Sequence, residues 1–161
     1  MPDLVTHTFA AYVVTRFGPW GAARFLFYLG TILPDVVSRP VYILMPRWYE
    51  YTIALHTPLF IALLGLLLSE GFAPALRATA RKALLAGAGL HFLLDMMQRH
   101  LSGGYLWLFP FSWRTFELGW FDTEATVGWT PVWVVAVIVI EISIYLQSQR
   151  RNPAPAKRKS C

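Results

Sequence analysis

The stretch TPVWVVAVIVIEISIYL, residues 130 to 146, decides the class of this protein. It contains 17 largely apolar residues, interrupted by Glu141 and Ser143, and a basic segment follows it. At 1.5 Å per residue such a helix covers about 25 Å, close to the bilayer hydrocarbon thickness of roughly 30 Å. The stretch therefore predicts a membrane-spanning helix.

The composition of the whole chain agrees with a membrane location. Of the 161 residues, 56% are hydrophobic and 14% are charged, whereas soluble domains carry about 25% charged residues. The length fits one unit, so we expect a single helical membrane domain over residues 1–149 and a disordered basic tail over residues 150–161. Cys161 is the one cysteine, which excludes an internal disulfide or cysteine-based zinc site.

Four further apolar segments precede the last one. Residues 51–69 and 83–97 are candidate spans, and residues 4–17 and 20–33 predict a tight helical hairpin, because Gly18-Pro19 separates them. The two hairpin segments are short, so they are thin or tilted spans or a re-entrant pair. The aromatic-rich residues 98–129 belong at the membrane–water interface. The predicted fold class is an all-α, polytopic membrane protein with about five apolar helical segments.

The distribution of Lys and Arg predicts how these segments are oriented. When five segments alternate across the membrane, one side receives ten basic residues and the other receives four: Arg39, Arg47, Arg99 and Arg114. Cytoplasmic loops carry the excess of positive charge, so we expect the N-terminus outside and the C-terminus in the cytoplasm. The net charge of +5 is then explained by topology and anionic lipid, and no nucleic-acid partner is expected.

Five side chains able to bind a metal ion fall at similar depth near the outer face under this topology: His7, Asp35, His56, His91 and Asp95. His91 and Asp95 are four residues apart and share one helix face. Simpler roles exist for each residue, including an ion pair, a hydrogen bond to a backbone carbonyl and a helix cap. An Asp in hydrocarbon costs about 2.5–3.5 kcal/mol and needs a partner, which favours a functional role for the pair.

Local sequence suggests how helices meet around these residues. Gly87, Ala88 and Gly89 lie one turn before His91 and would let another helix approach closely. Pro58 is expected to bend the helix beside His56. Pro34 is expected to end an apolar helix, leaving Asp35 at a boundary.

The ordered motifs resemble one known family. They are Thr6-His7, Gly30-Thr-Ile-Leu-Pro34-Asp35, His56-Thr57, His91-Phe-Leu-Leu-Asp95 and Gly104-Tyr-Leu-Trp-Leu-Phe-Pro110-Phe111-Ser112. Their order and spacing are similar to those of the prokaryotic membrane-bound metal-dependent hydrolases. That group includes the LexA-regulated inner-membrane hydrolases and is related to zinc-dependent phospholipase C. The usual acidic and His-Arg stretch between Asp35 and His56 is missing, so the resemblance does not extend to a second metal.

The resemblance implies that His7, Asp35, His56, His91 and Asp95 bind a divalent metal. Zinc suits this set best, with manganese or iron as alternatives. The expected activity is hydrolysis of a phosphoester or related bond in a lipid-like substrate at the inner membrane, with the site facing outward. Asp35 or Asp95 would accept a proton from water.

Three arginines on the same outer side have two interpretations. Arg39, Arg99 and Arg114 can neutralise a substrate phosphate, or they can reach lipid headgroups as solvated interfacial residues. The rival function is a membrane protein that binds or carries a metal without catalysis. A helical scaffold whose His and Asp residues merely pair is a third interpretation, and it predicts no bound metal.

Overall fold

The computed structural model describes residues 4–100, 103–122, 125 and 128–151. Within these residues every regular element is a helix. The loop region also contains two isolated β-bridges. The predicted all-α class is confirmed. The helices are α1 (Leu4–Phe17), α2 (Arg24–Leu44), α3 (Tyr49–Leu55), α4 (Pro58–Glu70), α5 (Pro74–Met97) and α7 (Thr130–Arg151), with short 3-10 turns at Gly21–Ala23 and Pro46–Trp48.

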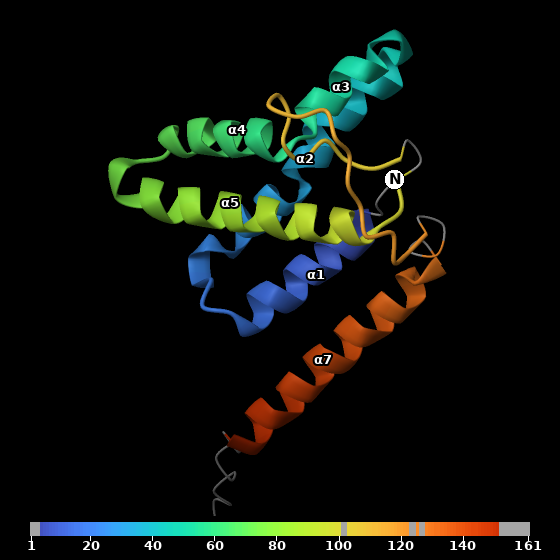
Figure 1. Cartoon of the computed structure of the whole chain (residues 1–161). Coiled ribbons are helices and arrows are strands. Elements are labelled where there is room, and N and C mark those ends of the chain that lie inside the picture. Colours follow the sequence, from blue (N-terminus) through green and yellow to red (C-terminus); the bar gives the residue numbers. More distant parts are fainter. Residues whose placement is uncertain (1–3, 101–102, 123–124, 126–127, 152–161) are drawn as a thin grey trace, which may run out of the picture.

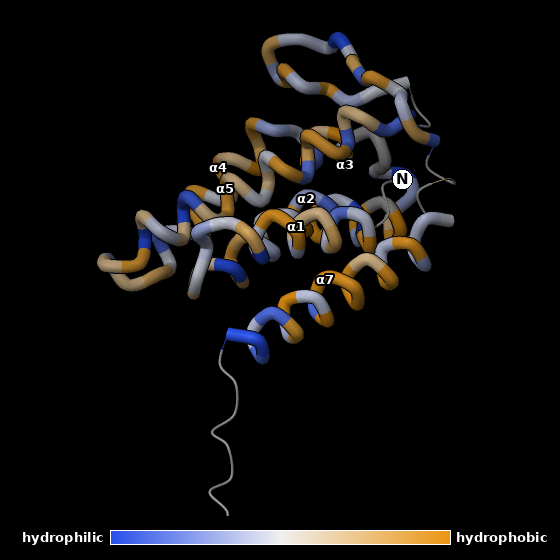
Figure 2. The backbone as a smooth tube through the Cα atoms, turned by 90° about the horizontal axis from the view of Figure 1, so that it is seen from below, coloured by the Kyte–Doolittle hydropathy of each residue, from blue (hydrophilic) through white to orange (hydrophobic). Residues whose placement is uncertain are grey.

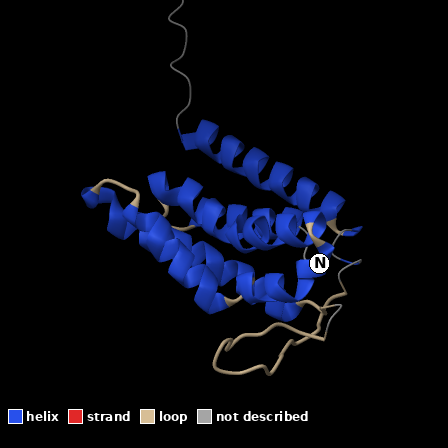
Figure 3. Cartoon of the chain, turned by 90° about the horizontal axis from the view of Figure 1, so that it is seen from above, coloured by secondary structure: helices blue, strands red, loops and turns tan. Residues whose placement is uncertain are grey.

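Helices α1, α4 and α7 run opposite to α2 and α5, and α1 and α7 begin near the end of the bundle where α5 finishes (Figure 1). Helix α2 packs most extensively on α5, and α4 covers another side of α5. Two clusters form the core, one centred on Ile61 and Phe92 and the other on Ala11 and Phe27. The loop after α5 and helix α7 lie on opposite sides of the bundle (Figure 3).

Glycines set the distance between α2 and α5. A Cβ atom added to Gly87 would lie 2.1 Å from the carbonyl oxygen of Phe27, and one added to Gly30 would lie 2.2 Å from that of Leu84. The two backbones therefore touch, which confirms the predicted close approach at Gly87. The prediction was wrong at Gly89, where an added Cβ meets nothing within 4 Å.

Helix α2 departs from the sequence-based expectation. The prediction that the helix ends at Pro34 is wrong, because α2 contains both Pro34 and Pro40 and continues to Leu44. Pro34 is fully buried, so the packing of α2 on its neighbours offsets the cost of about 3 kcal/mol that an internal proline imposes. Asp35 consequently lies in the middle of a helix rather than at its boundary.

The segment 51–69 is also divided differently from the prediction. Instead of bending at Pro58, the chain breaks completely at His56, which caps the C-terminus of α3. Thr57 then acts as the N-cap of α4, its hydroxyl accepting a hydrogen bond from Phe60 N at 3.4 Å, and Pro58 occupies the first turn. Proline fits the first turn because its missing N–H needs no partner there.

One helix of the described residues is long and apolar enough to cross a membrane. This is α7, with 22 residues, a mean hydropathy of 1.8 and no part of its apolar window buried. In Figure 2, where the backbone is coloured by residue hydropathy, α7 is mainly hydrophobic and ends in hydrophilic residues. Helix α4 is apolar but has 13 residues, so five membrane spans are not confirmed. Helix α7 includes Arg150 and Arg151, and the rest of the predicted tail, residues 152–161, lies outside the described residues.

Candidate metal centre

Helix α5 supplies the centre of the cluster. His91 and Asp95 project from one face of the helix and are both 0% exposed. His91 Nδ1 lies 2.7 Å from the carbonyl oxygen of Thr31, and a carbonyl can only accept, so Nδ1 donates. In a neutral ring the proton is then on Nδ1 and His91 Nε2 carries a lone pair. That Nε2 atom lies 3.1 Å from Asp95 Oδ2.

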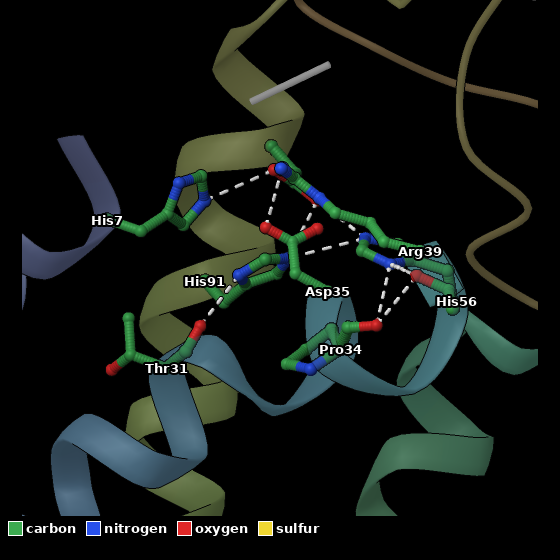
Figure 4. A network of polar contacts seen from close by, with 9 residues as sticks. His7, Thr31, Pro34, Asp35, Arg39, His56 and His91 are labelled. Carbon is green, nitrogen blue, oxygen red and sulfur yellow. Dashed lines mark hydrogen bonds and ion pairs between the residues drawn. The ribbon is translucent and has the colours of Figure 1, made fainter. Parts of the chain in front are cut away.

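His56 is oriented in the same manner from the break between α3 and α4 (Figure 4). Its Nδ1 lies 3.1 Å from Ser38 Oγ and 3.3 Å from the carbonyl oxygen of Pro34. The hydroxyl of Ser38 donates to that same carbonyl oxygen at 2.8 Å, so Ser38 Oγ accepts from His56 Nδ1. His56 Nε2 is thereby directed at Asp95 Oδ2, 2.8 Å away.

His7 and Asp35 complete the cluster from α1 and α2. His7 is fully buried, and its Nε2 lies 3.2 Å from Asp95 Oδ1. Asp35 is 3% exposed and its Oδ2 lies 2.8 Å from an Arg39 nitrogen. The structure thus brings together all five residues that the sequence indicated. Their donor atoms form two overlapping groups with every separation within 4.8 Å, His7–His91–Asp95 and Asp35–His56–His91.

The arrangement brings the lone pairs of two imidazoles close to a carboxylate. His56 Nε2 and His91 Nε2 lie 3.3 Å apart, and both face the carboxylate of Asp95. If both rings are neutral, two lone pairs and a carboxylate converge in a space excluded from water, which is unfavourable. A proton on the rings or a metal ion among them removes that repulsion. Histidines whose other nitrogen donates to a carbonyl or hydroxyl are typical of metal ligands.

The three arginines are placed differently from one another. Arg39 reaches the cluster through its ion pair with Asp35. Arg99 pairs instead with Asp122 at 3.1 Å, where both side chains are largely exposed. Arg114 is an exposed residue of the loop, whose backbone nitrogen donates to Ser112 Oγ. Of the three, Arg39 is the one that the structure brings to the candidate centre.

Tyr105 is a site residue that sequence reasoning missed. It is 8% exposed, and its ring stacks on His56 with centroids 5.6 Å apart. Burial and the negative charges of Asp95 and Asp35 raise its pKa far above the ordinary value of 10.0. Such a shift keeps the phenol protonated beside these carboxylates.

The loop around Tyr105 explains how this residue reaches the cluster. Phe116 N donates to the carbonyl oxygen of Tyr105 at 3.2 Å. Gly104 precedes it with φ of +114°, a conformation that favours glycine. The dipeptide Gly103-Gly104 was the sequence signal that could have indicated a tight turn just before Tyr105. The prediction placed the whole aromatic segment at the interface instead.

Comparison with known proteins places the chain in a family. The family model described as "YdjM inner membrane protein" matches residues 3–157. The chain belongs to the YdjM inner membrane protein family. Neither a curated protein nor a solved structure matches it. Membership in the YdjM family confirms the prokaryotic inner-membrane part of the resemblance, and it agrees with the exposed apolar helix α7.

Proposed function

We propose that this YdjM-family chain is a metal-dependent hydrolase embedded in the inner membrane, acting on a phosphoester or related bond of a lipid-like substrate. The observation that carries the proposal is the convergence of three histidines on one carboxylate. His7, His56 and His91 each direct Nε2 at Asp95 over 2.8–3.2 Å. Structural ion pairs rarely gather three imidazoles on one buried carboxylate, whereas divalent-metal sites need such a set.

The residues present fit a metal ion of the zinc type. Imidazole and carboxylate donors suit zinc, and also manganese and iron. His7, His56, His91 and Asp95 would hold it, with Asp35 beside them. When bound, such an ion supplies Lewis-acid polarisation of a phosphoryl or carbonyl group.

Asp35 and Arg39 are the groups suited to act on substrate. Both oxygens of Asp95 contact imidazoles, so this carboxylate serves to hold the cluster. Asp35 has Arg39 beside it at 2.8 Å, and we assign it the role of accepting a proton from the attacking water. The guanidinium of Arg39, 23% exposed in its side chain, would bind a substrate phosphate through its planar fork of donors.

A metal site without catalysis is the second candidate. The observation that favours it is enclosure: Asp95, His91 and His7 are 0% exposed, and the His56 side chain is 12% exposed. Closed coordination is typical of structural metal sites, while catalytic sites keep an open position. A structural site predicts bound metal and no turnover.

Metal content tests the site first. Protein purified in detergent is analysed by mass spectrometry as wild type, His91→Ala, Asp95→Ala and His100→Ala. The last is the control, because His100 belongs to neither of the two donor groups. We expect near-stoichiometric metal in the wild type and the control, and loss in the other two, with helical content by circular dichroism unchanged. No metal in reconstituted wild type would overturn the proposal.

Turnover separates the two candidates. Metal-loaded wild type, Asp35→Asn and Arg39→Gln are assayed with phospholipids in mixed micelles and with a chromogenic phosphodiester. Hydrolysis that falls at least about 100-fold in Asp35→Asn, with metal retained, supports the hydrolase and the role of Asp35. Bound metal with no hydrolysis of any of these substrates would favour the structural site.

A further inference from the structure

A second site lies on the other side of α1 from the metal cluster. Helices α1, α2 and α7 line an apolar cavity of about 370 Å³ that is largely open to the outside, and its lining includes Phe9, Tyr12, Tyr28, Trp133 and Val137. At one end, Trp133 Nε1 donates to Thr6 Oγ1 at 3.2 Å and its ring stacks on Phe9. The volume lies within the range of about 300–1,000 Å³ found for ligand sites.

The opposite end of this cavity carries charge from all three helices. Arg16 lies one helical turn beyond Tyr12, Arg24 one turn before Tyr28, and Glu141 one turn beyond Val137. Residues four apart share a helix face, so each charged residue lies at the rim below a lining residue. The three helices thus place two arginines and one glutamate at the same end of the cavity.

These charges are held together and leave an excess of one positive charge. Arg16 Nε donates to Glu141 Oε1 at 2.8 Å, and the hydroxyl of Tyr12 donates to the same carboxylate. Arg24 is close enough to act electrostatically on Glu141. Its Nε atom is buried and has no hydrogen-bond partner among the described residues. A buried guanidinium N–H without an acceptor calls for a further negative group.

We propose that this cavity binds an anionic phospholipid of the cytoplasmic leaflet, with an acyl chain between α1, α2 and α7 and its phosphate at Arg24. An acyl chain matches the apolar lining, and a phosphate matches both the excess positive charge and the unsatisfied guanidinium. Helix α7 is apolar and long enough to span the bilayer, so the cavity opens to lipid. The proposal does not depend on the metal site, which lies on the other side of α1.

The depth of the charged rim agrees with this assignment. Leu146, where the apolar run of α7 ends, lies five positions beyond Glu141, which is about 7.5 Å along a helix. Arginine side chains cover such a distance by extending towards the headgroups. The next residues of α7 lead to Arg150 and Arg151, the basic end expected in the cytoplasm.

Retention of lipid tests the proposal. The full chain is exchanged into nanodiscs of phosphatidylglycerol or phosphatidylcholine, extracted into mild detergent and examined by native mass spectrometry. Arg24→Gln removes the phosphate partner, and Val137→Trp fills the cavity. Their matched controls are Arg77→Gln, which pairs with Glu70 at the same end of the bundle, and Val139→Trp, on an exposed part of α7.

We expect one tightly held phosphatidylglycerol in the wild type and in both controls, and at least a five-fold loss in Arg24→Gln and Val137→Trp. Phosphatidylcholine should be retained poorly. Equal retention in all variants would mean non-specific annular lipid and would overturn the proposal. Loss in Arg24→Gln with full retention in Val137→Trp would also overturn it, because the cavity would then hold no chain. Circular dichroism of each variant verifies that the helices are intact.

Discussion

The contact between α2 and α5 makes Gly87→Ala the sharpest test of the structure. The added Cβ would lie 2.1 Å from the carbonyl oxygen of Phe27, so the helices must part by about 1.3 Å to reach the ordinary 3.4 Å. The atom that it meets is backbone, which cannot move aside as a flexible side chain would. Overpacking of this kind costs about 1–3 kcal/mol, and we take the upper value here. Alanine returns roughly 0.5–1 kcal/mol of helix propensity, which leaves a net loss of about 2 kcal/mol.

Gly89→Ala is the matched control, because an added Cβ there meets nothing within 4 Å. It should be neutral or stabilising by up to about 1 kcal/mol. The measurement is unfolding of detergent-solubilised protein by denaturant, followed by circular dichroism. Metal content provides a second readout, since the Gly87 Cβ would also lie 2.8 Å from Thr31 N, and the carbonyl of Thr31 orients His91. Equal stability of the two variants would refute the close packing of α2 on α5.

Three other predictions follow from contacts outside that interface. Tyr105 is buried and its ring stacks on His56, so Tyr105→Ala should loosen His56 and lower metal affinity in a chelator competition about 10-fold; unchanged affinity would remove this supporting role. Glu141→Gln weakens the link from α7 to Arg16, and spin labels on α1 and α7 should show a broader distance distribution, whereas an unaltered distribution would mean that apolar contacts alone hold α7. Burial lowers the pKa of His100 below 6.5, so below pH about 6.5 the unfolded loop binds more protons than the folded loop and its stability falls as pH drops. Protease cleavage within the loop should therefore accelerate on acidification, and should lose that dependence in His100→Gln.

Periodicity and apolar length predicted the helices that depend on local signals. The segment 4–17 agrees with α1, and the start at residue 130 agrees with α7. Local rules failed where packing outweighs them. Pro34 does not end α2, because burial against other helices supports a helix that an isolated peptide would not form. The break at His56 was missed for a different reason. Thr57 and Pro58 are favourable residues for starting a new helix, and the prediction treated Pro58 only as a bend within one helix.

The five His and Asp residues of the candidate site could be predicted from residue type and from their positions along the apolar segments. The pairing of His91 with Asp95 follows from helical spacing, and the prediction that His7, Asp35 and His56 lie near them came from assigning the apolar segments to alternate directions. Tyr105 could not be found by these means, because its position depends on a loop that folds back after α5. The sequence also did not predict that Ser38 Oγ and the carbonyl oxygens of Thr31 and Pro34 orient the histidines, for a related reason. Backbone acceptors carry no sequence signal, and tertiary packing selects them.

The position of α7 in the chain has a consequence for biosynthesis. The five clustered donor residues are all made by residue 95, and Tyr105 follows ten residues later, whereas α7 begins at Thr130. Chains fold from the N-terminus during translation, so the donor cluster can assemble while the last helix is still within the ribosome. Helix α7 is then synthesised after the donor cluster has formed, and it packs along α1 through Trp133 and Glu141.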